Sequence, residues 1–193
     1  DIDQRLKLIN ILSHDVQRIE RLITDYSQIL KDEVALSKEK FRKVDLLPVI
    51  QSVVDDYNNI YHVKRNIKIS NINDGNKAYF IHGIENRIEQ IIANLLDNAI
   101  SFSEDGQDIE VKLSKNSNKE VIMNIIDEGE GFKEKDTEKI FKRFYSNRPD
   151  KFGQHSGLGL NIVKNLVEIH GGEINASNNK DKGARIEIIF PEA

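Results

Sequence analysis

DEGEGF at residues 127–132 and SGLGL at residues 156–160 decide the fold of this 193-residue chain. The first motif follows a run of apolar residues, so that the carboxylate of Asp127 ends a predicted strand and two alternate glycines follow it. The second motif opens an amphipathic helix. Glycine lets backbone approach a ligand closely, and a helix N-terminus behind glycines presents free N–H groups to phosphate. The pair of motifs indicates a nucleotide pocket, although ordinary turn glycines around a strand, a surface loop and a helix would give the same pattern.

The composition excludes several classes of protein. Acidic residues outnumber basic ones by 32 to 28, a net charge of −4, which disfavours nucleic acid as a partner. There is no cysteine, and hence neither a disulfide framework nor a zinc–thiolate site. No run of apolar residues is long enough to span a membrane, and the first residues do not resemble a signal peptide. We therefore expect a soluble chain that makes no direct membrane contact.

Residues 1–40 are predicted to form one long helix with an apolar stripe. Neither proline nor glycine interrupts residues 6–36, and apolar residues recur seven positions apart. Because a fully buried large apolar side chain contributes about 1.5–3 kcal/mol, a stripe of this size should be covered. We expect a helical bundle or a coiled-coil dimer formed through this segment, with packing of the helix on its own chain as the alternative. The two rows of the stripe are Ile2, Ile9, Val16, Ile23 and Leu30, and Leu12, Ile19 and Tyr26.

Residues 41–193 are predicted to form a layered α/β domain. After a short extended segment at 41–47, apolar periodicity and turn residues indicate helices at 48–64, 84–102 and 158–170. Strands are expected at 67–69, 78–81, 109–113, 121–126, 173–176 and 184–190. The segment between the two glycine motifs, residues 133–155, has no strong periodicity and is termed the lid.

The helix predicted at 84–102 carries the sequence NLLDNA at residues 94–99. The spacing places Asn94 and Asn98 on one face, with Leu95 and Leu96 turned away. Two amide oxygens opposite a glycine-rich phosphate loop are chemically reasonable for Mg²⁺, which binds few protein ligands together with substrate phosphates and waters. Alone, this pair would be better interpreted as two solvated asparagines.

Four motifs of this chain resemble, in the same order, the N, G1, F and G2 boxes of the ATP-binding domain of bacterial sensor histidine kinases. They are NLLDNA, DEGEGF, IFKRFY (residues 140–145) and SGLGL. The resemblance spans residues 44–190 and includes HGGEI and GARIEI near the end. It implies the Bergerat (GHKL) fold, a two-layer α/β sandwich of a mixed sheet with helices on one face, here preceded by a long bundle helix. The sequence of the lid is most similar to acid- and virulence-responsive envelope sensor kinases.

For the nucleotide base, the resemblance implies that Asp127 accepts a hydrogen bond from the amino group of adenine. Gly129 and Gly131 would let the chain pass the base. Phe141 and Phe144 would seat the lid on the core, which plain core aromatics would also do. The other residues that the resemblance places around ATP are Ser101, Phe102, Phe132, Tyr145, Arg148, Ser156, Leu158 and Leu160.

For metal and phosphate, the resemblance implies that Asn98 binds Mg²⁺ directly and that Asn94 binds it through water; these two are the predicted catalytic residues. Gly157 and Gly159 would bring backbone N–H groups to the phosphates. In related ATPases a glutamate stands at the position of Asn94 as the general base. An amide cannot take up a proton at neutral pH, so we expect slow hydrolysis and ATP kept for transfer.

At two positions the chain lacks a basic residue that the family commonly has. No basic residue follows Ala99, and Ser146 stands where an arginine commonly reaches phosphate. Arg148 or Arg143 would take that role.

His14-Asp15 invites a match to the phosphoacceptor box, which carries a proline five residues after its histidine. Here that residue is Ile19. One unbroken helix then leads to the domain, whereas the family places its acceptor in the first of two antiparallel helices. We therefore interpret residues 1–40 as the second helix of the dimerisation bundle, and residues 41–193 as the ATP-binding domain. No phosphoacceptor is expected in this chain, and His14 is not predicted to be one.

The resemblance implies a kinase that transfers the γ-phosphate of Mg-ATP to a bundle histidine, for relay to an aspartate of a response regulator receiver domain. The chain by itself should not autophosphorylate. It is expected to be a homodimer through the N-terminal helix, and to lie on the cytoplasmic side of an inner-membrane sensor. Alternatives on the same fold are an anti-sigma-type protein serine kinase and a nucleotide-gated dimerisation ATPase.

Overall fold

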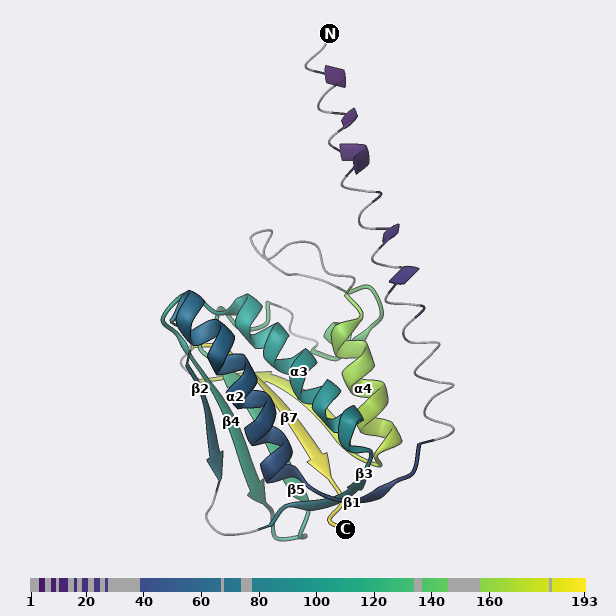
Figure 1. Ribbon diagram of the computed structural model, residues 1–193, viewed down its shortest axis with the longest axis vertical. Coiled ribbons are helices and arrows are strands. Elements are labelled where there is room, and N and C mark those ends of the chain that lie inside the picture. The colour runs from purple at the N-terminus through teal and green to yellow at the C-terminus, as the bar shows by residue number, and fades with distance from the viewer. Residues whose placement is uncertain are drawn as a thin grey trace.

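The computed structural model describes residues 39–193 apart from 67, 74–77, 134–136, 146–156 and 181, together with isolated helical positions between residues 4 and 27 (Figure 1). These isolated positions agree with the predicted long helix. Their apolar side chains face solvent, so packing of the helix on its own domain finds no support at these positions. The side chains concerned, each at least half exposed, are Leu8, Ile9, Ile11, Leu12, Val16, Ile19 and Ile23.

The described part of the domain contains every helix and strand predicted for it, with bounds shifted by a few residues. The helices are α2 (Leu46–Arg65), α3 (Glu85–Phe102) and α4 (Gly159–Ile169). The strands are β1 (Arg42–Asp45), β2 (Lys68–Asn73), β3 (Phe80–Gly83), β4 (Asp108–Lys115), β5 (Val121–Asp127), β6 (Glu173–Asn178) and β7 (Ala184–Phe190). A short 3-10 helix in the lid, η1 (Thr137–Phe141), was not predicted, because the lid lacks periodicity.

The strands form two sheets. The larger has the order β2-β4-β5-β7-β6, in which β2 and β4 are parallel and the other pairs are antiparallel. The smaller joins β1 and β3. The two strands predicted on either side of one turn, β2 and β3, therefore belong to different sheets.

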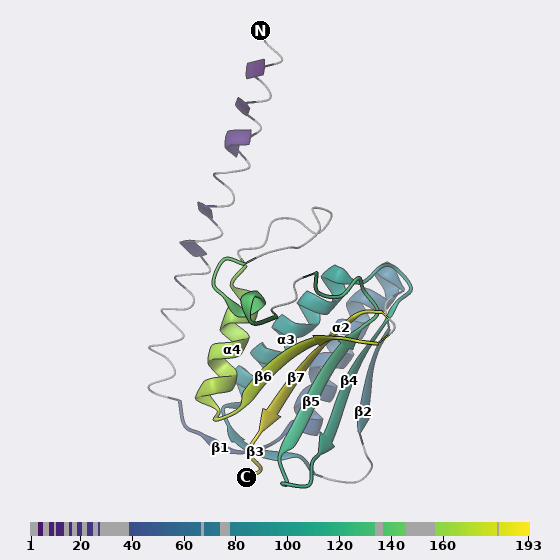
Figure 2. The ribbon, with the colours of Figure 1, turned by 180° about the vertical axis from the view of Figure 1, so that it is seen from behind.

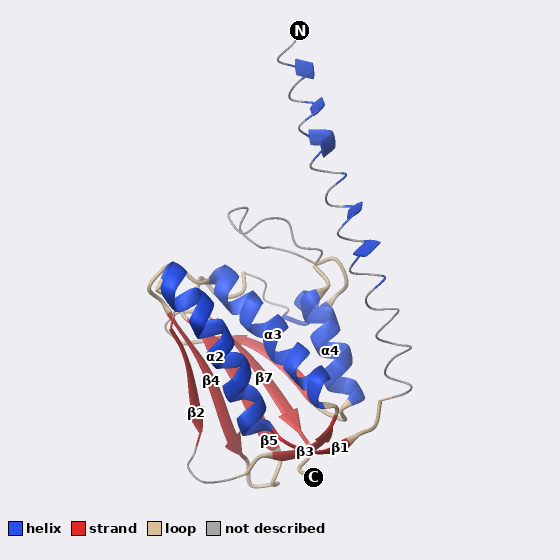
Figure 3. Ribbon diagram, in the orientation of Figure 1, coloured by secondary structure: helices blue, strands red, loops and turns tan. Residues whose placement is uncertain are grey.

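The domain has two layers. Helices α2, α3 and α4 lie side by side over one face of the larger sheet (Figure 1 and Figure 3), and the strands lie in front when the molecule is seen from behind (Figure 2). The predicted fold, a mixed sheet with helices on one face, is confirmed. Of the helices in the described part of the chain, none combines the length and hydropathy that a membrane crossing requires.

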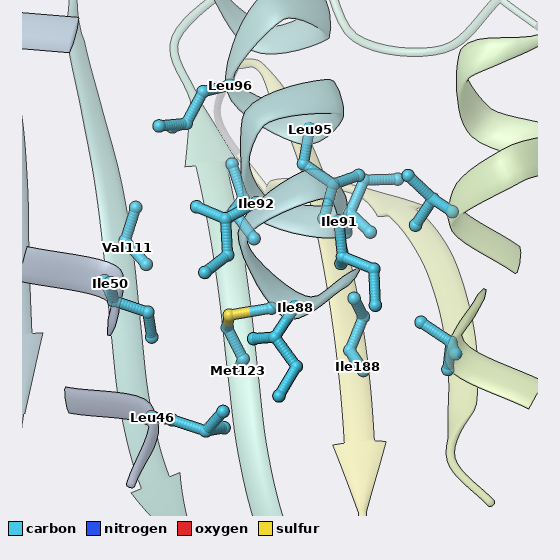
Figure 4. Close-up of a cluster of buried hydrophobic side chains, with 14 of the residues drawn as sticks. Leu46, Ile50, Ile88, Ile91, Ile92, Leu95, Leu96, Val111, Met123 and Ile188 are labelled. Carbon is cyan, nitrogen blue, oxygen red and sulfur yellow. The ribbon is translucent and has the colours of Figure 1, made fainter. Parts of the chain in front are cut away.

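Helix α3 lies at the centre of the core because its apolar residues recur at helical spacing. Ile88, Ile92, Leu95 and Leu96 are at most 2% exposed. They face the sheet, where Met123 and other apolar side chains of β4, β5 and β7 meet them (Figure 4). As predicted, Leu95 and Leu96 point into the core, which leaves the opposite face of α3 for polar residues.

Two polar side chains fix the ends of α3. At its C-terminus, where carbonyl oxygens run out of i+4 donors, Arg65 donates hydrogen bonds to the carbonyl oxygens of Ile100 at 2.9 Å and Ser103 at 2.7 Å. At its start, the buried imidazole of His170 accepts a bond from the N–H of Ile84 at 3.1 Å. Burial lowers the pKa of His170, which keeps the ring neutral for this role. Since His170 follows α4, this bond ties the end of α4 to the start of α3.

Candidate nucleotide-binding site

The carboxylate of Asp127 lies at the end of β5 and is 7% exposed. Its Oδ1 accepts hydrogen bonds from the backbone N–H groups of Gly129 at 2.9 Å and Ala184 at 3.1 Å. Among the residues that the structure describes, none donates to Oδ2, so that oxygen is available to a ligand. Burial raises the pKa of this carboxyl, an effect that the two N–H donors reduce.

Asp127 faces a pocket between α3 and the strands β5 and β7. The pocket has an empty volume of about 390 Å³, part of it open to solvent. Its wall is mostly apolar, and Asp127 is the charged residue in it, an arrangement that suits a flat ring with one hydrogen-bond donor. The lining residues besides Asp127 are Leu95, Asn98, Ala99, Phe102, Ile125, Gly131, Phe132, Ala184 and Ile186.

The two glycines after Asp127 are required by the protein's own packing. A Cβ on Gly129 would lie 2.4 Å from the carbonyl oxygen of Phe102, at the end of α3. Gly131 has φ +76°, and a Cβ there would lie 2.8 Å from Oδ1 of Asn178. The β6–β7 turn is taken here to include the flanking strand residues Asn178 and Ala184. The loop can therefore pass between α3 and this turn only without these side chains.

The amides of α3 border both the pocket and the start of α4. Asn98 lines the pocket and is partly buried. Asn94 donates from Nδ2 to the carbonyl oxygen of Gln90 at 3.0 Å. Its Oδ1 points toward the first residue of α4, because a Cβ on Gly159 would lie 3.6 Å from that oxygen. Asn94 thus lies beside the start of α4, and Asn98, four residues further along α3, lies in the pocket wall.

The N-terminus of α4 has no side-chain cap. Its N-cap residue, Leu158, is fully buried and makes no capping hydrogen bond from its side chain. The first N–H groups of a helix lack intrahelical acceptors and attract anions. Together with Asn94, this end of α4 therefore combines N–H donors with an amide oxygen, the groups that phosphate and its counter-ion require.

A family model matches residues 83–193, more than half of the chain; it is described as histidine kinase-, DNA gyrase B-, and HSP90-like ATPase. The chain belongs to this ATPase family. The matched region contains α3, the loop after Asp127 and α4, so the whole pocket lies within it. The predicted family resemblance is confirmed.

Individual relatives of this ATPase domain are sensor proteins. Sensor protein ChvG of Agrobacterium fabrum is 36% identical over 203 residues, which cover 99% of this chain and 34% of that protein. The chain thus spans about a third of the length of that relative. The structure of the mycobacterial sensor histidine kinase MprB has a TM-score of 0.67 at 26% identity and covers 78% of this chain and 97% of that one.

The same fold occurs in the crystal structure of histidine kinase ThkA in complex with response regulator protein TrrA. That structure has a TM-score of 0.70 at 23% identity, and the match covers 100% of this chain and 53% of the other.

Five of the residues predicted to contact ATP or its metal ion are brought together in this ATPase pocket. Asn98, Phe102, Asp127, Gly131 and Phe132 line it. Ser101 does not, because it is buried and its hydroxyl donates to the carbonyl oxygen of Asp97 within α3. Its predicted contact with ATP stays a prediction.

The residues predicted to contact ATP from the lid and from the second glycine motif lie outside the lining of this pocket or outside the described residues. Tyr145 and Leu160 pack against the hydrophobic core, and neither lines this pocket. Gly157 and Gly159 flank the N-cap residue of α4. Their contacts to phosphate stay predictions. Arg148, Ser156 and His14 lie outside the described residues.

Of the two phenylalanines predicted to seat the lid, only Phe141 does so. Phe141 is 6% exposed, and its carbonyl oxygen accepts a hydrogen bond from Asn161 of α4 at 3.0 Å. Phe144 is 56% exposed and has φ +63°. This left-handed backbone turns its side chain outward, while the next residue, Tyr145, packs inward. The expected role of Phe144 is thus corrected to Tyr145.

Two residues of the β6–β7 turn belong to the site and were not among the predicted ones. Ala184 donates its N–H to Asp127 and lines the pocket. Gly183 has φ +95°, and a Cβ on it would lie only 1.8 Å from the carbonyl oxygen of Asp127. The sequence did contain a signal for these two residues, because they belong to the motif GARIEI, which resembles the family. That resemblance alone does not indicate that the motif lies beside the nucleotide base.

Proposed function

We propose that this chain is the ATP-binding catalytic part of a sensor histidine kinase. The observation that carries the proposal is Asp127, a buried carboxylate with one oxygen held by two backbone N–H groups and the other available to the pocket. An acceptor in this position selects a base with an amino group, as adenine has. The sensor-protein relatives favour a histidine kinase over the other branches of the family.

In this proposal, Asn98 binds Mg²⁺ directly and Asn94 binds it through water. Their donor set fits the ion, because amide oxygens are hard ligands and the phosphates of ATP complete the shell. When bound, Mg²⁺ would offset the charge of the phosphates. Asn94 cannot act as a general base toward water, so ATP is preserved for transfer to a histidine instead of being hydrolysed.

The N-terminal residues 1–40 are proposed to be the second helix of a dimerisation bundle, with residues 41–193 as the catalytic domain. The exposed apolar side chains between Leu8 and Ile23 support a homodimer, because they have no cover within the chain at the described positions. A response regulator receiver domain is the proposed final acceptor, a role supported by the complex that histidine kinase ThkA forms with response regulator protein TrrA. We place the domain on the cytoplasmic side of an inner-membrane sensor.

The proposal is tested by transfer of labelled phosphate from ATP to a separately prepared two-helix bundle that carries an acceptor histidine. Acid-labile label should appear on the bundle and not on the chain. Asn98→Ala should slow transfer by about tenfold or more, because even the loss of a hydrogen-bond partner behind a metal ligand commonly costs about 10- to 100-fold. Asn175→Ala, an exposed asparagine on β6, is the matched control and should transfer at the wild-type rate.

Other outcomes of this assay would contradict the proposal in distinct ways. Acid-stable label on a serine would indicate a serine kinase, and free phosphate without transfer would indicate an ATPase clamp. Label on the chain itself that His14→Gln removes would show that His14 is the acceptor.

A further inference from the structure

Asn178, the last residue of β6, holds the far end of the loop that follows Asp127. Its Oδ1 accepts a hydrogen bond from the N–H of Phe132 at 2.6 Å, and its Nδ2 donates to the carbonyl oxygen of Phe132 at 2.9 Å. One amide thus satisfies both backbone groups of one residue, across 46 positions of sequence. Such a two-point bond fixes the orientation of the peptide as well as its position.

The loop between Asp127 and Phe132 has little other support. The β-ladder of β5 ends at Asp127. Among the described residues, no backbone–backbone hydrogen bond joins residues 128–133 to the rest of the domain, apart from those within strands. At the near end, the N–H of Gly129 donates to Asp127, and the side chain of Glu128 accepts a hydrogen bond from the N–H of Asp108 at 3.1 Å. At the far end, the amide of Asn178 is the polar contact that remains.

The same turn holds both ends of this loop. Asn179 donates to the carbonyl oxygen of Asp127 at 3.3 Å, and the N–H of Ala184 donates to the carboxylate of Asp127. Asn178 holds Phe132, whose side chain lines the pocket and packs against the core. The β6–β7 turn therefore sets the distance between the carboxylate and the wall formed by Gly131 and Phe132.

We propose that Asn178 is a positioning residue for the nucleotide pocket: its two-point bond to Phe132 holds the wall against which the base packs. This inference rests on the proposed function, because it takes the ligand to be an adenine nucleotide. Asn178 is exposed, so its removal leaves no buried polar group unpaired, and water can replace both bonds. Removal of Asn178 should instead leave the loop between Asp127 and Phe132 less ordered, and binding is weakened because the nucleotide must then order the loop.

The first test is calorimetric titration of Asn178→Ala with ADP and with a non-hydrolysable ATP analogue in the presence of Mg²⁺. The two hydrogen bonds between Asn178 and Phe132 are termed the clamp. Its loss should weaken nucleotide binding about five- to tenfold, the equivalent of one net hydrogen bond. The loss should be equal for both nucleotides, because Phe132 meets the base and not the phosphates. Asn175→Ala, on the same strand, should bind like wild type, and the two variants should melt at the same temperature.

The second test needs no nucleotide: hydrogen exchange at the Phe132 amide. Exchange should be slow in wild type and in Asn175→Ala, and fast in Asn178→Ala. Equal exchange in all three would overturn the clamp, and equal affinity in all three would overturn its role in binding. If wild type bound no nucleotide at all, both the proposed function and the role of Asn178 in binding would be refuted. Hydrogen exchange at Phe132 would still decide whether the clamp exists.

Discussion

Gly183→Ala is expected to destabilise the domain by about 3 kcal/mol or more and to abolish nucleotide binding. Its φ of +95° lies in a region that costs other residues about 1–3 kcal/mol. Its new Cβ would also lie 1.8 Å from the carbonyl oxygen and 2.7 Å from the carbonyl carbon of Asp127. Backbone cannot rotate aside as a side chain does, so overpacking adds about 1–3 kcal/mol. A shift of the Asp127 backbone that relieves this overlap also displaces its carboxylate from the pocket.

Denaturant unfolding of Gly183→Ala measures the loss of stability. Gly159→Ala is a matched control for stability, because its new Cβ would lie 3.6 Å from the nearest atom outside its neighbours, an ordinary contact. That variant should unfold at the wild-type midpoint or slightly above, since alanine favours the helix. If the two variants proved equally stable, the close approach of the β6–β7 turn to Asp127 would be refuted.

Asp127→Asn is expected to weaken nucleotide binding by about 1.5–3 kcal/mol, or about 10- to 150-fold, the contribution of a hydrogen bond to a charged group. Oδ1 can still accept the N–H groups of Gly129 and Ala184, so the loop keeps its shape. The amide nitrogen then occupies the place of Oδ2, where it presents a donor to the amino group of adenine. Two donors facing one another cannot form the bond that the carboxylate forms.

Calorimetry with an ATP analogue measures the loss in Asp127→Asn. Inosine triphosphate, which carries an oxygen in place of the amino group, provides the control for the base. Wild type should prefer the adenine nucleotide, and the variant should lose that preference. Unchanged affinity for the adenine nucleotide in the variant would refute the adenine assignment of Asp127.

The same substitution should not lower stability at neutral pH. Burial raises the pKa of Asp127 in the folded state, so the folded protein holds the proton more tightly than the unfolded chain. The carboxyl therefore favours folding below its unfolded pKa, and this contribution is lost as pH rises through the folded pKa. At neutral pH the ionised group opposes folding, a cost that asparagine removes. Asp127→Asn should melt at or above the wild-type temperature at neutral pH, with the difference shrinking on acidification; a lower melting temperature at neutral pH would contradict this.

The sequence by itself determined the elements that carry the site. The periodicity of α3 placed Asn94 and Asn98 on one face and Leu95 and Leu96 in the core. Local spacing is sufficient for this, because it decides which side chains share a face of a helix. The end of β5 at Asp127 and the start of α4 at its glycines were likewise local signals. Linked motifs in a fixed order then sufficed to identify the ATPase fold.

Tertiary structure alone decided which distant segments meet. Asn178 and Gly183 act on a loop some fifty positions earlier, and that contact depends on the pairing of β7 with both β5 and β6, which joins segments far apart in sequence. The exposure of Phe144 was not predicted either, because the motif does not specify its left-handed backbone, with φ +63°. Local spacing encodes which faces are buried, whereas the wall of the nucleotide pocket arises from contacts between strands far apart in sequence.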